Sequence, residues 1–470
     1  MAAGTPARQE VPRKTGDGGF LALYGSGALG ASVLLQTIIL WLVYYYAPPA
    51  GQGRTLLPPT LVGFALAAGR VVNAVSNPPV AFWSDRSRAR WGRRRPFIVL
   101  GAPALALAFA LLWTPPRAPQ EMVFVYVTAG LACFFFLFSL VMNPYAAMLP
   151  EITPGGRGRA TAASWQAGAS LAGVGVAMIA SPWLIQRWGF GTMGVVLAAL
   201  GLACLWIVGT VGRPAAVNPG PAPRRGAFLR EVGAVLRHRG FRVYVAALAL
   251  LWLGTSMVNT TVVYVVTVLM GLPRDQVALV LGTAFVCTVA ALAPLARLSR
   301  ALGTTRALTW TLAAATTVVP LIGAIGLRGL PFGPPAQGYA VIVLAAAPLA
   351  GLLVFPNVLL ADIAEADGVA SGEAREAMFY AVQGLVLNGA TALASAFLGV
   401  LLSLGDSPGQ ALGLRLIPVV AAACTLAALL VFLRYPRAAA LPAAAPPAAS
   451  GPAARAKDAP RADRRGARSR

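Results

Sequence analysis

An arginine and two asparagines stand at helical spacing inside a long apolar stretch of this sequence. Arg70, Asn73 and Asn77 are separated by three and four residues, so on a helix their side chains share one face. A guanidinium is a permanent cation and an amide both donates and accepts hydrogen bonds, but neither titrates near neutral pH. The stripe can bind an anionic or hydroxyl-rich small molecule. Equally, Arg70 can serve the structure by hydrogen-bonding helix carbonyls or side-chain amides.

Further uncharged polar side chains interrupt the apolar stretches near their midpoints. Amides, hydroxyls and aromatic rings in an apolar setting suit a neutral polyol such as a sugar, although each such group can also join two helices. We therefore expect a polar path through the interior of the protein. Candidates to line it, besides the stripe, are Gln36, Tyr145, Ser256, Asn259, Thr260, Asn357 and Gln383.

The sequence lacks a constellation for covalent or metal-assisted catalysis. Its one histidine, His238, stands among basic residues in a polar segment, so neither a Ser–His arrangement nor a pair of histidine ligands can form around it. The four cysteines fall in separate apolar stretches, which argues against a disulfide framework and against a metal site. We predict no enzymatic activity, no cofactor and no bound metal.

The composition predicts that these residues stand in a chain that crosses a membrane repeatedly. Of 470 residues, 57% are hydrophobic and 11% charged, and the mean hydropathy is +0.70, above that of soluble domains. An apolar helix needs about 20 residues to cross the hydrocarbon core. We predict an all-α polytopic membrane protein whose twelve transmembrane helices cover residues 20–46, 58–83, 96–114, 121–149, 160–186, 190–212, 242–270, 275–297, 305–327, 337–362, 378–404 and 412–434.

The positive charge of the chain is confined to alternate connections. Of the 38 basic residues behind the net charge of +23, 31 fall in the two tails and every second loop, 6 in the other loops, and one, Arg70, inside a span. This asymmetry predicts a multi-pass protein of the cell (inner) membrane with both termini cytoplasmic. The expected partners are a small-molecule substrate and the lipid bilayer. No nucleic acid is needed to explain the charge, and we expect a monomer.

The polar segments divide the chain into two groups of six spans. We predict a disordered cytoplasmic tail (1–19), an N-terminal six-helix bundle (20–212), a cytoplasmic central loop (213–241), a C-terminal six-helix bundle (242–435) and a disordered basic Ala/Pro-rich tail (436–470). The central loop carries apolar residues at helical spacing among arginines, which predicts an amphipathic helix on the membrane surface or, alternatively, a helix that docks a partner. Its apolar residues are Phe228, Leu229, Val232, Val235 and Leu236.

Four stretches match the signatures of a known family. They are "NAVSNPPVAFWSDRSRARWGRRRPFIVLGAP" (73–103), "YGSGALG" (24–30), "NPYAAMLPEIT" (143–153) and "LLADIAEADGVASGEAREAMFYAVQG" (359–384). In these the chain resembles the glycoside-pentoside-hexuronide:cation symporters of the major facilitator superfamily, and the first stretch is most similar to the sucrose-proton branch. The resemblance implies two six-helix bundles related by pseudo-two-fold symmetry, which alternate access to a central cavity.

The resemblance also implies a cytoplasmic gate in the loop after the second span. Its members are Asp85, Arg86, Arg90, Gly92, Arg93 and Arg94, and the carboxylates available to the arginines at inner helix ends are Glu151, Asp362, Glu365 and Glu376. Such pairs must break in each cycle, so each can contribute only about 1 kcal/mol. The alternative for any one arginine is a pure topology signal, which Asp85 does not fit.

At the centre the chain departs from the family. The family's two cation-binding aspartates of span two fall on Asn73 and Asn77, and its other ionisable positions fall on neutral residues: Ala31, Ser32, Met142 beside Asn143, Gln166 and Asn388. An asparagine keeps the carbonyl oxygen but loses the charge. We therefore add Ser32, Asn143, Gln166 and Asn388 to the predicted substrate contacts.

These departures remove the usual basis for sodium or proton symport. The sequence predicts a secondary transporter of a small polar solute, with a sugar or glycoside as the expected substrate, by uniport or an unusual coupling. One alternative is a carrier of an amphipathic or anionic solute that Arg70 recognises. The other, from a different class, is a non-transporting membrane receptor or enzyme.

Overall fold

The computed structural model describes residues 18–87, 94–152, 156–211, 232–233, 235–327, 329, 332–371 and 376–436. Within these ranges the chain is helices and connecting turns, and its single β-bridge pairs Ser407 with Gln410. The predicted all-α fold is confirmed. The expected disordered tails lie almost wholly outside the described residues.

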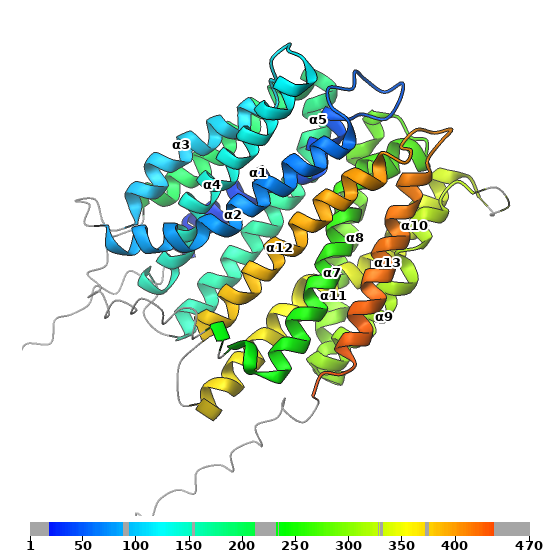
Figure 1. Ribbon diagram of the computed structural model, residues 1–470. Helices are drawn as coiled ribbons and strands as arrows, with labels where there is room; N and C mark the ends of the chain where they lie inside the picture. The colour runs from blue at the N-terminus through cyan, green and yellow to red at the C-terminus, as the bar shows by residue number, and fades with distance from the viewer. Residues whose placement is uncertain are drawn as a thin grey trace, which may run out of the picture.

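The N-terminal half of the chain forms five helices, the last of which is bent (Figure 1). Gly189 has φ 80° and ψ 174°, outside the helical region, and divides the last helix into two arms. A glycine is suited to this bend because it has no Cβ to clash at positive φ. The five helices are α1 (Gly18–Tyr46), α2 (Pro59–Arg86), α3 (Arg95–Leu111), α4 (Gln120–Ile152) and α5 (Gly156–Val211).

The C-terminal half repeats this arrangement with more interruptions. A π-helix, η1 (Val265–Leu269), extends the first helix, and a four-residue helix follows the third. The remaining elements are α7 (Arg239–Tyr264), η2 (Arg274–Gln276), α8 (Val277–Leu302), α9 (Thr304–Val318), α10 (Leu321–Ala324), α11 (Pro334–Ser371), α12 (Glu376–Leu402) and α13 (Leu412–Phe432).

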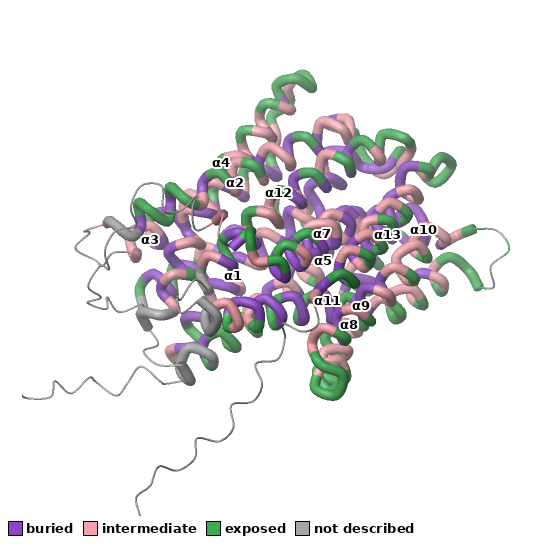
Figure 2. The backbone as a smooth tube through the Cα atoms, turned by 60° about the horizontal axis from the view of Figure 1, so that its bottom comes forward, coloured by how far each residue is buried: buried purple, intermediate pink, exposed green. Residues whose placement is uncertain are grey.

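The helices have the length and exposure of membrane spans. Ten helical stretches of the described chain are long and apolar enough to cross a membrane, and the 50-residue stretch in α5 contributes two crossings because of its bend. With the shorter apolar helix α3, the count is consistent with the predicted twelve. Buried residues line the insides of the bundles, while large apolar side chains such as Met122 and Val125 are exposed on the outside (Figure 2).

Two tyrosines mark the correspondence between the halves. The Tyr24 hydroxyl of α1 donates to the carbonyl oxygen of Tyr145 on α4 (2.9 Å). The Tyr244 hydroxyl of α7 lies 2.7 Å from the carbonyl oxygen of Pro356 on α11. Tyr145 directly follows Pro144, so each bond ties the first helix of a half to the proline region of its fourth.

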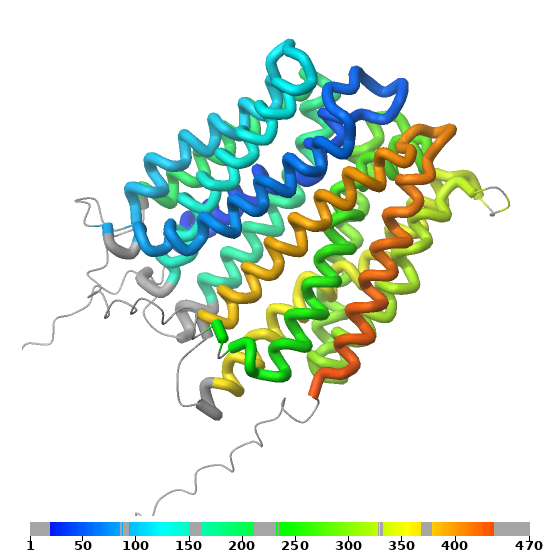
Figure 3. The backbone as a smooth tube through the Cα atoms, viewed as in Figure 1, coloured from blue at the N-terminus to red at the C-terminus, as the bar shows by residue number. Residues whose placement is uncertain are grey.

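The two halves are joined at one end of the molecule, which we call the distal end; it contains the loop between α1 and α2. One hydrophobic core runs through α1–α5 and continues into the distal parts of α7, α12 and α13. A second core fills only the opposite, proximal part of the C-terminal half. In Figures 1 and 3, α2 and α12 accordingly approach each other distally and separate toward the proximal end.

Close backbone contacts seal the distal junction. A Cβ added to Gly63 of α2 would come within 2.5 Å of the Ser395 carbonyl oxygen on α12, and one added to Gly399 would come within 2.6 Å of the Pro59 carbonyl oxygen. Gly175 of α5 packs equally closely on the Phe285 ring of α8. The backbones of α2 and α12 therefore touch without intervening side chains at this end, whereas α5 packs on a side chain of α8.

Part of the predicted central-loop helix is described. Residues 232–233 and 235–237 are helical, and Val235 is buried in the proximal core of the C-terminal half. His238 caps α7 by accepting a hydrogen bond from the Phe241 amide at 3.1 Å. Phe228 and Leu229 lie outside the described residues.

Candidate functional site

The polar stripe of α2 lies against α4. Asn77 Oδ1 accepts hydrogen bonds from Ser139 Oγ at 2.8 Å and from Asn143 Nδ2 at 3.1 Å. Asn73 Nδ2 donates to the Phe135 carbonyl oxygen at 3.4 Å. The two asparagines therefore play opposite roles, because Asn77 accepts with its side chain and Asn73 donates.

Ser139 is a member of this cluster that was absent from the sequence prediction. It precedes Asn143 by four residues, and Phe135 precedes it by four more, so all three share one face of α4. A search for helical spacing around Asn143 would have found it. Its hydroxyl lies inside an apolar run, where a serine more often bonds to its own helix.

Arg70, the third member of the stripe, is held differently. Its guanidinium carbon lies 4.8 Å from the centroid of the Phe135 ring, a cation–π arrangement. Its Nε is buried and has no hydrogen-bond partner among the described residues. A guanidinium with an unused donor in an apolar setting is costly, so this position invites a polar or anionic ligand.

Helix register places Arg70 at the same level as Asn388 of the C-terminal half. Gly63 of α2 meets Ser395 of α12, and the two helices run in opposite directions. On α2, Arg70 lies seven residues, about two turns, from Gly63 toward the proximal end. On α12, Asn388 lies seven residues from Ser395 in the same direction. Asn388 is partly exposed. The two positions therefore occupy one level, directly below the distal junction.

A polar contact joins the halves at a similar depth. Gln36 Nε2 of α1 lies 3.5 Å from Asn259 Oδ1 of α7. Gln36 stands ten residues from the end of α1 at Tyr46, and Asn259 ten residues from the end of η1 at Leu269, about 15 Å in each case. We call Gln36, Arg70, Asn259 and Asn388 the mid-depth set.

The other predicted contacts lie within one half or the other. Ser32 Oγ of α1 is 3.0 Å from Ser170 Oγ of α5. Tyr145 stacks on Tyr24 at 4.7 Å between ring centroids, with Gln166 close to its hydroxyl. Gln383 Oε1 lies 2.9 Å from the Tyr244 hydroxyl.

Three further polar residues take part in hydrogen bonds within a single helix. Asn357 Nδ2 donates to the Leu353 carbonyl oxygen at 3.2 Å. The Thr260 hydroxyl donates to the Ser256 carbonyl oxygen at 2.9 Å. Among the predicted site residues, Gln36 and Asn259 thus bond between the halves, whereas the other polar groups described above bond within one half.

Carboxylates are placed away from this level. Every Asp and Glu among the described residues lies in a loop, in the first turn of a helix or within the last three turns of one. Asp362, on α11, is the deepest of them and is exposed toward the proximal end. No described carboxylate therefore accompanies Arg70 at mid-depth.

The predicted gate residues gather at proximal helix ends. Asp85 and Arg86 end α2, Glu151 ends α4, Asp362 and Glu365 stand near the end of α11, Glu376 begins α12, and Arg94 precedes α3. Arg90, Gly92 and Arg93 lie outside the described residues, as do the side chains of Asp85, Arg86, Glu151 and Glu376. The gate stays a prediction.

Comparison with known proteins gives a consistent picture. Residues 23–437 match the family model described as MFS/sugar transport protein. An uncharacterized symporter of Synechocystis, sll1374, is 27% identical over 39% of this chain and 35% of its own length. A provisionally named 2,3-dihydroxypropane-1-sulfonate exporter of Salmonella typhimurium is 26% identical over 46% of this chain and 48% of its own length. The alignments thus span about a third to a half of these curated relatives.

Solved structures share the fold. The nucleoside transporter NupG superposes with a TM-score of 0.62 at 12% identity, over 89% of this chain and 100% of NupG. At this identity the likeness concerns the architecture alone.

The opposite roles of the two asparagines give a test of the α2–α4 cluster. Asn73→Asp should lower stability by about 1–3 kcal/mol at pH 8, because a carboxylate cannot donate to the Phe135 carbonyl. At acidic pH a protonated carboxyl can donate, so the loss should shrink. Asn77→Asp keeps the acceptor for Ser139 and Asn143 and should cost less at both pH values. Thermal unfolding of the two purified variants measures this; equal losses would contradict the assignment.

Proposed function

Because this chain belongs to the MFS/sugar transport protein family of membrane transporters, we propose that it carries a sugar or glycoside across the cell membrane by alternating access. The observation that carries the proposal is the Gln36–Asn259 contact between α1 and α7, together with the helix register that places Arg70 of α2 and Asn388 of α12 at a similar depth. Amide groups both donate and accept, so they match the hydroxyls of a polyol. Ser32, Asn73, Asn77, Asn143, Tyr145, Gln166 and Gln383 would shape the surrounding walls.

The distribution of basic residues supports an orientation. Arg54, Arg117, Arg187, Arg274 and Arg415 are the described basic residues of the distal loops and helix ends, one to each connection, whereas the arginine-rich segments adjoin proximal helix ends. The positive-inside rule then places the proximal end, with both termini and the segment 213–241, in the cytoplasm. Under this orientation the closed distal end would face outward, and we propose that the structure represents the inward-facing state of a monomer with an N-terminal bundle (20–212) and a C-terminal bundle (242–435).

We propose that transport does not require a sodium or proton gradient. Proton coupling needs a titratable group at the site, and a carboxylate among the oxygen ligands strengthens a sodium site, whereas the described carboxylates lie away from mid-depth. The Asn77 oxygen, the neutral counterpart of a cation ligand, is already bonded to Ser139 and Asn143. A cation would have to displace these donors without gaining a charged partner.

An anionic polyol is the second candidate, and the buried Nε of Arg70 favours it. A sulfonate, phosphate or carboxylate on the substrate would supply the acceptor that this donor lacks and would neutralise the guanidinium. The exporter of a three-carbon sulfonate among the relatives fits this chemistry. Substrates with and without the anionic group decide between the candidates.

Uptake into proteoliposomes tests the main proposal. Labelled mono- and disaccharides, sucrose among them, should enter down their own gradient at a rate unchanged by an imposed sodium or pH gradient. Asn388→Leu should lower the initial rate by about tenfold or more, since it removes one amide of the mid-depth set. Asn357→Leu is the matched control, because that amide bonds its own helix. Sodium-driven accumulation, or equal rates in the two variants, would overturn the proposal.

A pair of small ligands tests the second candidate. If Arg70 binds an anion, 2,3-dihydroxypropane-1-sulfonate should raise the thermal unfolding midpoint of the purified protein, whereas glycerol, the same skeleton with a hydroxyl in place of the sulfonate, should not. Arg70→Gln should abolish the shift, and Arg297→Gln, an exposed arginine of α8, should retain it. A shift that survives in Arg70→Gln would exclude this role for Arg70.

A further inference from the structure

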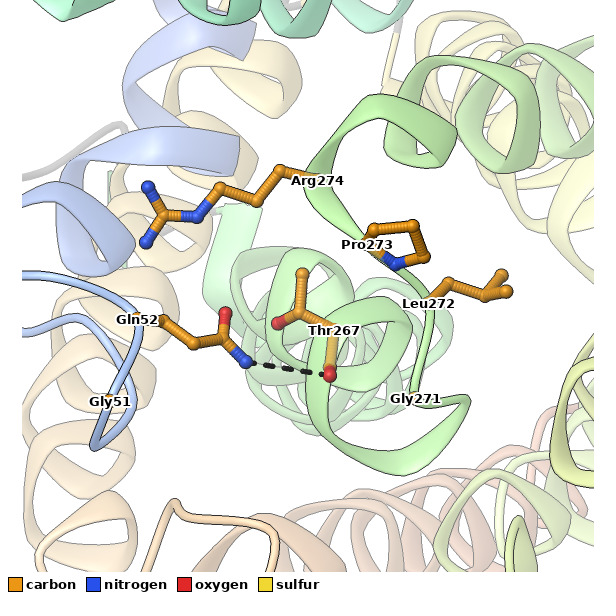
Figure 4. A pocket seen from close by; sticks show the side chains of 7 residues that line it. All are labelled: Gly51, Gln52, Thr267, Gly271, Leu272, Pro273 and Arg274. Atoms are coloured by element: carbon orange, nitrogen blue, oxygen red, sulfur yellow. Dashed lines mark hydrogen bonds between the residues drawn. The ribbon is translucent and has the colours of Figure 1, made fainter.

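A chain of hydrogen bonds crosses between the two halves at the distal surface. Arg274 Nε, on η2, donates to the Tyr44 hydroxyl of α1 at 3.0 Å, and that hydroxyl donates to Gln52 Oε1 at 2.6 Å. Gln52 Nε2 then lies 3.5 Å from the Thr267 carbonyl oxygen of η1 (Figure 4). This series of hydrogen bonds thus begins in the C-terminal half at Arg274 and ends in the same half at Thr267.

Aromatic packing surrounds these hydrogen bonds. The guanidinium carbon of Arg274 lies 5.3 Å from the centroid of the Tyr44 ring. The Tyr44 and Tyr264 rings meet edge to face at 5.3 Å, and the buried Tyr264 hydroxyl donates to the Ala47 carbonyl oxygen. Each contact joins an N-terminal residue to a C-terminal one.

The π-helix η1 positions the two C-terminal residues of this series, Thr267 and Arg274. The Met270 amide donates to the Val265 carbonyl oxygen at 2.9 Å, one residue further along than an α-helix allows. This widened turn ends at Gly271, whose φ is 66°, and the chain then turns back to place Arg274 beside Tyr44. Single π-turns inside helices recur at functional positions, because they redirect backbone groups that an α-helix would use internally.

We propose that Tyr44, Gln52, Thr267 and Arg274 form the lock of the distal gate, with Arg274 as its positioning residue. The proposal rests on alternating access and goes beyond it, since it names the bonds that must break before the distal side can open. Each bond is individually weak. Together they hold the closed state while leaving it reversible.

A pocket lies directly against the lock. It measures about 510 Å³ and is lined by Gly51, Gln52, Thr267, Gly271, Leu272, Pro273 and Arg274 (Figure 4). In the close-up, the Gln52 amide points to Thr267, and the Arg274 side chain extends toward α1. Three of the four lock residues, Gln52, Thr267 and Arg274, therefore line the pocket, which becomes the distal vestibule of the transport path when the lock opens.

Neighbouring tyrosines provide a matched test. Tyr44→Phe removes the hydroxyl that links Arg274 to Gln52. Tyr45→Phe removes a hydroxyl that donates to the Trp113 carbonyl oxygen at 3.0 Å, wholly within the N-terminal half. Arg274→Gln and Gln52→Ala break the lock at its other members.

Hydrogen–deuterium exchange of the full chain in lipid nanodiscs measures the opening. Amides of 47–57 and 265–276 should exchange about three- to tenfold faster in Tyr44→Phe and Arg274→Gln than in the unmodified protein, and Tyr45→Phe should exchange like the unmodified protein. Equal exchange in Tyr44→Phe and Tyr45→Phe would overturn the proposal. If Arg274→Gln does not fold, Gln52→Ala, a change in a loop, decides by the same criterion.

The outcome is separable from that of the proposed function. The exchange measurement needs no substrate, so a failed lock leaves sugar uptake untouched. Conversely, absence of sugar uptake leaves a difference between Tyr44→Phe and Tyr45→Phe standing.

Discussion

A polar side chain in the middle of a membrane-spanning bundle must find a partner inside the protein or lie against a polar path, because hydrocarbon offers none. Most mid-span polar groups described here meet the first condition. Asn73, Asn77, Ser139 and Asn143 bond one another or a carbonyl across α2 and α4, and Thr260 and Asn357 bond their own helices. Arg70 keeps an unused buried donor. Under the proposed function, the same constraint that explains the bonded amides places this donor of Arg70 on the transport path.

The junction between the halves gives this residue its setting. At the distal end, glycines bring α2 onto α12 without intervening side chains, and the N-terminal core continues into the C-terminal helices. Toward the proximal end the cores are separate. The mid-depth set lies where the close contact ends, so a solute held there would be covered on the distal side. The hydrogen bonds of Tyr44 and Arg274 lie on the distal side of this apolar junction. They hold the two halves in a defined orientation and can break when the distal end opens.

The sequence predicted those structural features that depend on a single helix. Apolar runs of about 20 residues predicted the spans, and the spacing of Arg70, Asn73 and Asn77 correctly placed them on one helix face. It could not tell that Asn73 donates while Asn77 accepts, because that depends on which groups of α4 stand opposite. Tyr44 and Arg274 are 230 residues apart in the chain, and Arg274 had the appearance of an ordinary loop charge. Their pairing depends on a π-turn and on the packing of two halves, neither of which leaves a local pattern.

Among the described residues no carboxylate lies at mid-depth, in contrast to the cation symporters that the sequence resembles, and this has a thermodynamic signature. Titration calorimetry with a bound saccharide or sulfonate, repeated in buffers of different ionisation enthalpy between about pH 6 and 8, counts the protons exchanged on binding. Binding should neither take up nor release protons, because amides and a guanidinium do not titrate in that range. Uptake or release approaching one proton per ligand would contradict it, since a titratable acid would then have to take part in binding.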